Sequence, residues 1–368
     1  MKVKLETLSP VKIGTREGQE LDRLNSFVVG DKVVKVNIDK VISKNPDKAN
    51  QIVKFIDDGK ANKLFEGEEK YWKFSVPFID EHTKDLFRRK GEIDPQILQA
   101  DDTIYFPGSS VKGAIRTSLL TYYYMNNPSA WWFKNNRIER EVEKYFRVGE
   151  NDPKRDCMKG FQISDSESKK VEDAGIVFPV KTYSKNYDKL EPKHWETLHM
   201  AIAPGKKFET EITLYEELLA GMAKRWGEEK KIKGILGGFS EEQIIDKLIE
   251  ATTMVSLERI ERDLNYLQSC ENSFQFSLVI DQLEKFREEV MKEDSAVLNL
   301  GFGMGRLSST IQLAAKDDKV KKKLREMYAR KGYQKGDLSN PWPKTRRFFL
   351  EEEDPSGELG WVKMVIKR

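Results

Sequence analysis

The sequence predicts an α+β protein in which a long helical segment interrupts a sheet-forming part. Val3 to Leu8 alternates apolar and polar residues as a strand does, and Leu359 to Val362 begins a last apolar strand. Between these ends, residues 216–292 repeat apolar side chains at helical spacing, with Glu, Lys and Arg at the other positions. The two ends of the chain are therefore both strand-like, with the helical segment between them.

Composition limits the classes of protein that fit. The 368 residues suffice for two or three domains, or for one domain with insertions, and 34% charged residues give a net charge of only +3. Near neutrality does not exclude a nucleic-acid partner, because binding depends on cations that cluster on one face. Cys157 and Cys270 are far apart, and no apolar run approaches the roughly 20 residues that span a bilayer. We expect a cytoplasmic protein without a membrane partner.

The first 215 residues alternate strands, turns and helices. Residues 26–39 read as a hairpin with its turn at Gly30-Asp31, and residues 72–78, 160–165, 176–183 and 207–215 read as further strands. Helical segments are expected up to about Asn62, at 81–90 and at 137–146. In the later helical segment, Gly234, Gly237 and Gly238 mark a break.

Residues 105–120, YFPGSSVKGAIRTSLL, combine a turn, a helix start and two cations. We expect the hydroxyl of Ser109 or Ser110 to cap the helix. Lys112 and Arg116 then lie one turn apart on a polar face that also carries Ser109. Free amides at a helix start beside a Lys/Arg pair suit a phosphate backbone. A surface helix with ordinary solvated cations is the alternative.

The glycines of that segment do not form a nucleotide site. Gly108 and Gly113 have the spacing of a P-loop, but Ala114 and Ile115 stand where that motif needs Lys and Ser/Thr. No nucleoside triphosphate site is therefore expected here.

A second candidate is the glycine loop, residues 300–310 with the sequence LGFGMGRLSST. Gly301, Gly303 and Gly305 leave the backbone unobstructed, so its amides could approach an anionic chain, and Arg306 follows at once. The pattern is not the dinucleotide fingerprint, which needs a preceding strand. A tight turn that binds no ligand is the alternative.

The remaining candidates are single residues. Lys12 and Arg16 lie in the polar, basic loop that follows the first strand, and Asp22 is an acid in a charged loop near the N-terminus. His194 and His199 are five residues apart, which does not align them on one helix face, so no metal site is expected.

Four motifs in order carry a family resemblance: S-P-V-K-I-G at 9–14, F-P-G-S-S-V-K-G-A-I-R at 106–116, G-F-G-M-G-R-L at 301–307, and W-P-K-T-R-R at 342–347 followed by L-G-W-V at 359–362. The chain resembles the RAMP proteins of CRISPR effector complexes. More narrowly, it is similar to the head, or cap, subunits of type III-A Csm complexes, because the first motif is followed by a V-V-G-D-K-V-V-K-V hairpin.

The resemblance implies a modified ferredoxin-like, RRM-like core with inserted helices. We expect residues 1–215 to form its first part, residues 216–295 a helical insertion, and residues 296–368 its completion. The partners implied are CRISPR RNA, target RNA, the repeated backbone RAMP subunit and other Csm subunits, without a cofactor. The RNP aromatic signatures of a true RRM are missing, which argues against bases stacking on the sheet.

The implied function is a noncatalytic RNA-binding subunit that caps the 3′ portion of CRISPR RNA and helps hold target RNA. The alternative is a RAMP-type endoribonuclease, for which Asp22 is the nearest candidate. The RNA-binding residues that the resemblance implies are Lys12, Arg16, Ser109, Ser110, Lys112, Gly113, Arg116, Gly301, Gly303, Gly305 and Arg306.

Overall fold

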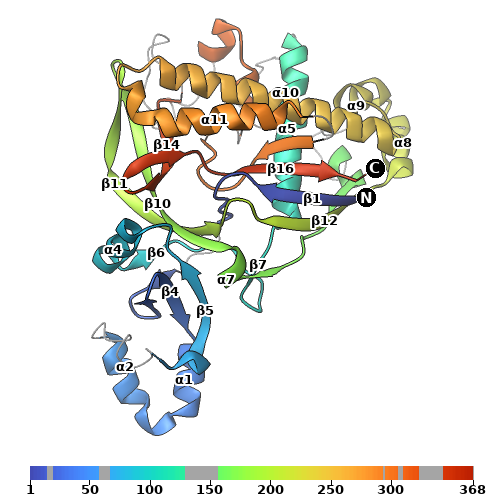
Figure 1. Ribbon diagram of the computed structural model, residues 1–368. Coiled ribbons are helices and arrows are strands. Elements are labelled where there is room, and N and C mark those ends of the chain that lie inside the picture. The colour runs from blue at the N-terminus through green and yellow to red at the C-terminus, as the bar shows by residue number, and fades with distance from the viewer. Residues whose placement is uncertain are drawn as a thin grey trace.

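The computed structural model describes residues 1–14, 20–57, 67–128, 156–292, 295–305, 310–322 and 343–367. In these ranges the chain forms two larger antiparallel sheets, a smaller three-stranded sheet and a group of long helices (Figure 1). The helix expected at 137–146 lies outside the described residues.

Sheet 1 joins the two ends of the chain, each of which the sequence predicts to be a strand. Its strands run in the order β13-β16-β1-β12-β8. They are β1 (Lys2–Thr7), β8 (Phe161–Ile163), β12 (Lys207–Leu214), β13 (Ser295–Asn299) and β16 (Trp361–Ile366). The first strand lies between β12 and β16, with Val3 opposite Thr210 on one side and Ile366 on the other. Figure 1 accordingly shows the N- and C-termini side by side.

Helices pack against both faces of sheet 1. They are α5 (Gly108–Asn126), α8 (Glu216–Trp226), α9 (Glu229–Leu236), α10 (Glu241–Gln268) and α11 (Ser277–Val290). Val3 and Leu5 alternate with Lys2 and Lys4, so only one face of β1 enters the core. The helix break that the glycines predict is confirmed, since α9 ends at Gly237 with φ +81°.

Sheet 2 has the order β11-β10-β14-β15. Its strands are β10 (Gly175–Asn186), β11 (Lys189–Ile202), β14 (Thr345–Glu351) and β15 (Asp354–Gly357). β11 was not predicted, because the sequence indicates only a segment with His194 and His199 between the strands expected at 176–183 and 207–215. Residues Lys189 to Thr197 are almost all exposed, so they lack the alternation that marks a strand, and pairing with β10 forms the strand instead.

A small unit with its own core projects from these sheets (Figure 1). Its strands β3 (Ser26–Val29), β4 (Lys32–Val36) and β5 (Trp72–Pro77) pack against α1 (Ile38–Lys44) and α2 (Ala49–Asp57). The predicted hairpin is confirmed, because Gly30 takes φ +59° at the turn between β3 and β4.

Shorter elements connect these parts. The strands are β2 (Leu21–Asp22), β6 (Glu92–Ile93), β7 (Thr103–Ile104) and β9 (Lys169–Lys170), and the helices are α4 (Glu81–Lys90), as the sequence predicts, and α7 (Val171–Ala174). The 3-10 turns are η1 (Pro46–Lys48), η2 (Glu69–Tyr71), η5 (Cys157–Gly160), η6 (Ser273–Phe276) and η7 (Ile311–Ala314). No helix in the described part of the chain combines the length and apolar character needed to cross a bilayer.

Candidate nucleic-acid interface

The start of α5 is built differently from the prediction. The helix begins at Gly108, after Pro107, and no serine side chain caps it. Instead the backbone N–H of Gly108 donates to Oδ1 of Asp165, 2.8 Å away. A Cβ at Gly108 would stand 2.1 Å from the carbonyl oxygen of Ile163, so only glycine lets the helix start reach β8. The expectation that Ser109 or Ser110 caps the helix is wrong, because a carboxylate from another segment already binds there.

The outward face of α5 keeps part of the predicted cationic surface. Ser109 and Gly113 are exposed, and Lys112 is half-buried between them. Burial lowers the pKa of Lys112, although the charge of Asp156 acts in the opposite sense. Nothing lies within 4 Å of the place a Cβ would take on Gly113, so the backbone is open there.

Arg116 does not form a free pair with Lys112. Its Nη1 lies 2.6 Å from Oδ2 of Asp156, with the two side chains 27% and 17% exposed. A half-buried ion pair of this kind neutralises the arginine and fixes it to the segment that precedes β8. Of the two predicted cations, Lys112 is therefore the one offered to a ligand.

Lys12 is not a surface cation. Its side chain is 2% exposed, its Nζ forms an ion pair with Asp94, and it lies 4.9 Å above the centre of the Phe302 ring. Burial would raise the pKa of Asp94, but hydrogen bonds from His199 and Lys12 outweigh it and hold that pKa at about 2. Lys12, which the sequence places in a polar, basic loop as a candidate RNA contact, is therefore enclosed by the fold, and Arg16 lies outside the described residues.

His199 completes this cluster, in which Lys12 and His199 are buried and Asp94 is half-exposed. Its Nδ1 lies 3.3 Å from Asp94 Oδ2, and its ring lies 4.4 Å from the ring of Phe302. Burial lowers the pKa of His199, which favours the neutral imidazole. The other histidine of that pair, His194, is exposed. No group of residues that could hold a metal ion occurs in the described ranges.

The glycine loop packs inward. Gly301, Gly303 and Gly305 have φ of +89°, +85° and +74°. A Cβ on Gly301 would lie 2.3 Å from the carbonyl oxygen of Lys12, and one on Gly303 would lie 2.4 Å from Cδ1 of Leu359. The expected open backbone is thus absent at these two glycines, which are needed for the turn and for close packing.

The end of the loop is less enclosed. Gly305 is exposed, and the nearest atom to its hypothetical Cβ is Nη2 of Arg259 at 3.8 Å. Arg306 lies outside the described residues. Of the three predicted glycines, Gly305 alone retains an approachable backbone.

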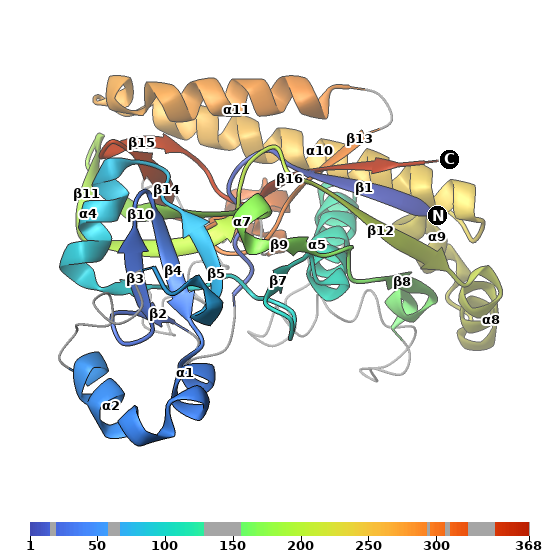
Figure 2. The ribbon, with the colours of Figure 1, turned by 60° about the horizontal axis from the view of Figure 1, so that its bottom comes forward.

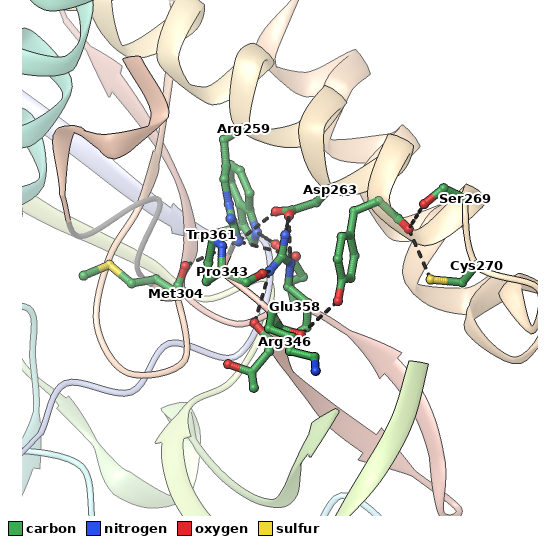
Figure 3. Close-up of polar contacts among 12 residues, drawn as sticks. Arg259, Asp263, Ser269, Cys270, Met304, Pro343, Arg346, Glu358 and Trp361 are labelled. Carbon is green, nitrogen blue, oxygen red and sulfur yellow. Dashed lines mark hydrogen bonds and ion pairs between the residues drawn. The ribbon is translucent and has the colours of Figure 1, made fainter. Parts of the chain in front are cut away.

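A buried ionic network under the loop escaped the sequence analysis (Figure 3). Asp263 of α10 forms ion pairs with two arginines: Arg346 Nε and Nη2 each lie 2.9 Å from its Oδ1, and Arg259 Nη2 lies 2.8 Å from its Oδ2. Arg259 also lies 3.6 Å from Glu358 and donates to the carbonyl of Met304 in the glycine loop. The network therefore ties the loop to α10 and β14.

Glu358 is a second buried acid of this network. Trp361 Nε1 donates to its Oε2 at 3.2 Å. Burial and the negative charge of Asp263 raise the pKa of Glu358 to about 7. Arg346 and Trp361 belong to the last of the four motifs that carry the family resemblance, and here they serve the packing of the core. That motif membership was the one sequence signal for the network.

Asp22 has a local structural role. Its Oδ1 accepts from the backbone N–H groups of Leu24 and Asn25, at 2.9 and 3.1 Å. This side chain forms the turn between β2 and β3.

Comparison with known proteins agrees with this architecture. The model of the RAMP superfamily matches residues 4–327. A curated relative described as "CRISPR system Cms protein Csm5", from Methanocaldococcus jannaschii, is 24% identical over 406 residues, covering 100% of this chain and 89% of the relative.

Two solved structures have a similar fold. A chain of a Csm-crRNA-target RNA ternary complex of a type III-A CRISPR-Cas system superposes with a TM-score of 0.73, at 22% identity and with 100% of both chains covered. The crystal structure of T. onnurineus Csm5 gives a TM-score of 0.65, at 21% identity, covering 99% of this chain and 100% of that one. With the family model matched over most of its length, this chain belongs to the RAMP superfamily.

Proposed function

We propose that this chain is an RNA-binding subunit of a type III-A CRISPR ribonucleoprotein, where it caps the 3′ portion of the CRISPR RNA and helps hold complementary target RNA. The observation that supports this proposal is similarity over the whole chain, in sequence to a curated Csm5 and in fold to a chain of a Csm-crRNA-target RNA complex. The same likeness favours the repeated backbone RAMP subunit and other Csm subunits as its protein partners.

The core proposed for this subunit is ferredoxin-like. Along the chain β1, α5, β8, β12, α10 and β16 follow one another as strand, helix, strand, strand, helix, strand. In sheet 1 the four strands of this series lie in the order β16-β1-β12-β8, which places the fourth beside the first, as the ferredoxin-like arrangement requires. β13 then extends the sheet at the β16 edge.

This core refines the proposed division of the chain. We propose residues 1–215 and 296–368 as the two parts of the core, and residues 216–295 as a mainly helical part between them. Because α10 takes the place of the second core helix, we assign the role of insertion to α8, α9 and α11.

The proposed RNA contact is the outward face of α5, with Ser109, Ser110, Lys112 and Gly113. Lys112 supplies a cation, the hydroxyls supply hydrogen-bond donors, and the open backbone at Gly113 allows a close approach. The outer face of β1 carries Lys2, Lys4 and Glu6 in place of aromatic rings, so bases have no stacking surface on this strand. RNA recognition is therefore proposed to be electrostatic and tolerant of sequence.

The subunit is proposed to be noncatalytic and to act in antiviral defence in the cytoplasm. Asp22, the acid considered for RNA cleavage, is engaged by two backbone amides of its own turn. Incubating the purified chain with end-labelled RNA, with and without divalent metal, tests this point. Full-length RNA is expected in both samples, and metal-dependent fragments would support the endoribonuclease instead.

RNase footprinting of complexes assembled with and without this subunit tests the principal proposal. Protection of the 3′ end of the CRISPR RNA is expected only in complexes that contain the subunit. Equal protection in both complexes would contradict the capping function.

A further inference from the structure

A bulge in sheet 2 exposes an aromatic side chain that the proposed function does not use. In the β10–β11 hairpin, Lys181 lies opposite Glu196 and Tyr183 lies opposite Pro192. One residue of β10 therefore faces three of β11, and these three, residues 193–195, are all exposed. Bulges are used in proteins to re-aim a side chain, and they occur preferentially near functional sites.

The side chain presented by this bulge is Trp195, which is 81% exposed. Tryptophan is usually well buried, because its ring supplies more apolar surface than any other side chain. Here the ring contributes little to the core, and its neighbours in the bulge are Lys193 and His194.

The C-terminus of α4 brings further cations to the bulge. Arg88, Arg89 and Lys90 form its last turn and are exposed. Nζ of Lys90 donates to the carbonyl oxygen of Glu196, which fixes the end of the helix beside the bulge. Figures 1 and 2 both show α4 next to sheet 2, away from α5.

Part of this positive charge is not neutralised. Asp85 pairs with Arg88 at 2.9 Å, and the carboxylate of Glu196 faces His82 at 3.5 Å. Within the ranges that the structure describes, no carboxylate lies at ion-pair distance from Arg89, Lys90 or Lys193, so these three cations remain available to an anion.

We propose that Trp195 stacks on an unpaired base of single-stranded RNA whose phosphates lie against Arg89, Lys90 and Lys193. A flat exposed ring among cations is the arrangement with which proteins bind single strands without reading their sequence, because every base has a π-face. The inference rests on the proposed RNA-binding function and adds a second contact, separate from the face of α5.

Binding of fluorescein-labelled oligouridylate to the full chain tests the proposal, with an abasic ribose-phosphate chain of equal length as the second probe. Trp195→Ala should weaken oligouridylate binding about 5-fold or more and should leave the abasic probe unaffected. Trp195→Phe should retain most of the affinity. Tyr187→Ala is the matched control, because Tyr187 is 90% exposed at the tip of the same hairpin and has no role in the proposal.

The salt dependence separates stacking from charge. Trp195→Ala should leave the slope of log affinity against log salt unchanged, since it removes no cation. The double variant Arg89→Ala and Lys193→Ala should lower that slope by roughly 1.4, at about 0.7 for each phosphate contact on a single strand.

Three outcomes would overturn the proposal. If the unaltered chain binds neither probe, the proposed function fails together with this site. If it binds and Trp195→Ala binds oligouridylate equally well, only this site fails. If Trp195→Ala binds RNA normally but no longer co-purifies with the other subunits, the ring contacts a protein instead.

Discussion

The glycine loop and the outward face of α5 contain the same kinds of residue, yet one packs inward and the other faces solvent. A Cβ on Gly301 or Gly303 would collide with Lys12 or Leu359, whereas a Cβ on Gly113 would meet nothing within 4 Å. Glycines near cations can thus mark either close packing or an open backbone. The atoms that decide between them come from distant parts of the chain.

A variant in the ionic network beneath the loop should give the largest change in stability among the tests of this contrast. Asp263→Asn should lower the free energy of unfolding by about 3–5 kcal/mol, because it leaves Arg259 and Arg346 buried without their shared carboxylate. Urea denaturation measures the change. Asp281→Asn makes the same substitution at an exposed position of α11 and should cost less than about 0.5 kcal/mol. Equal stability of the two variants would mean that the network does not hold the loop.

The loop itself gives the next largest effect. Gly303→Val should destabilise the fold by about 3 kcal/mol, since a β-branched residue is strained at φ +85° and its Cβ would collide with Leu359. Gly113→Ala is the control: the position is open and lies inside α5, so alanine should stabilise by up to about 1 kcal/mol. Normal melting of Gly303→Val with impaired RNA binding would restore the loop as a ligand site.

Local patterns were sufficient for much of the fold. The turn at Gly30, the helix at 81–90 and the helix break at Gly237 each depend on residues within a few positions of one another. The strand character of both chain ends was also predictable, because each has a clear strand sequence, but the pairing of β16 with β1 was not. β11 was not predictable, since residues 189–197 are mostly exposed and form a strand through pairing with β10.

The candidate site was harder to predict for the same reason. Asp165 replaces the expected serine cap of α5 from 57 residues further along the chain. Lys12 looked solvated because its loop is basic, but Asp94 and Phe302 enclose it in the fold. Neither periodicity nor spacing indicates such partners. Cationic residues could therefore be recognised from the sequence, but whether their side chains face solvent or the core could not.

The pH dependence of the free energy of unfolding tests the buried ionic network beneath the glycine loop. The pKa of Glu358 is raised from its ordinary 4.5 to about 7, so between these values the folded chain holds a proton that the unfolded chain has lost. Stability should therefore fall as the pH rises through this window, by at most about 1.4 kcal/mol per pH unit. The difference between the unaltered chain and Glu358→Gln isolates this slope, because other titrating groups are common to both. Parallel curves would contradict a buried, protonated Glu358.

The outward face of α5 is tested by a variant with a smaller effect, which should lower RNA affinity and leave the stability of the fold unchanged. Lys112→Gln removes the one predicted cation of α5 that remains available, while Arg116 stays paired with Asp156. RNA affinity should fall several-fold, about 1 kcal/mol, and the salt slope should fall by roughly 0.7, the share of one phosphate on a single strand. Fluorescence anisotropy at several salt concentrations measures both. Lys2→Gln, on the face of β1 turned away from the core, should change neither quantity. If the two variants bind RNA alike, the face of α5 does not contact the RNA and the contrast with the glycine loop is one of packing alone.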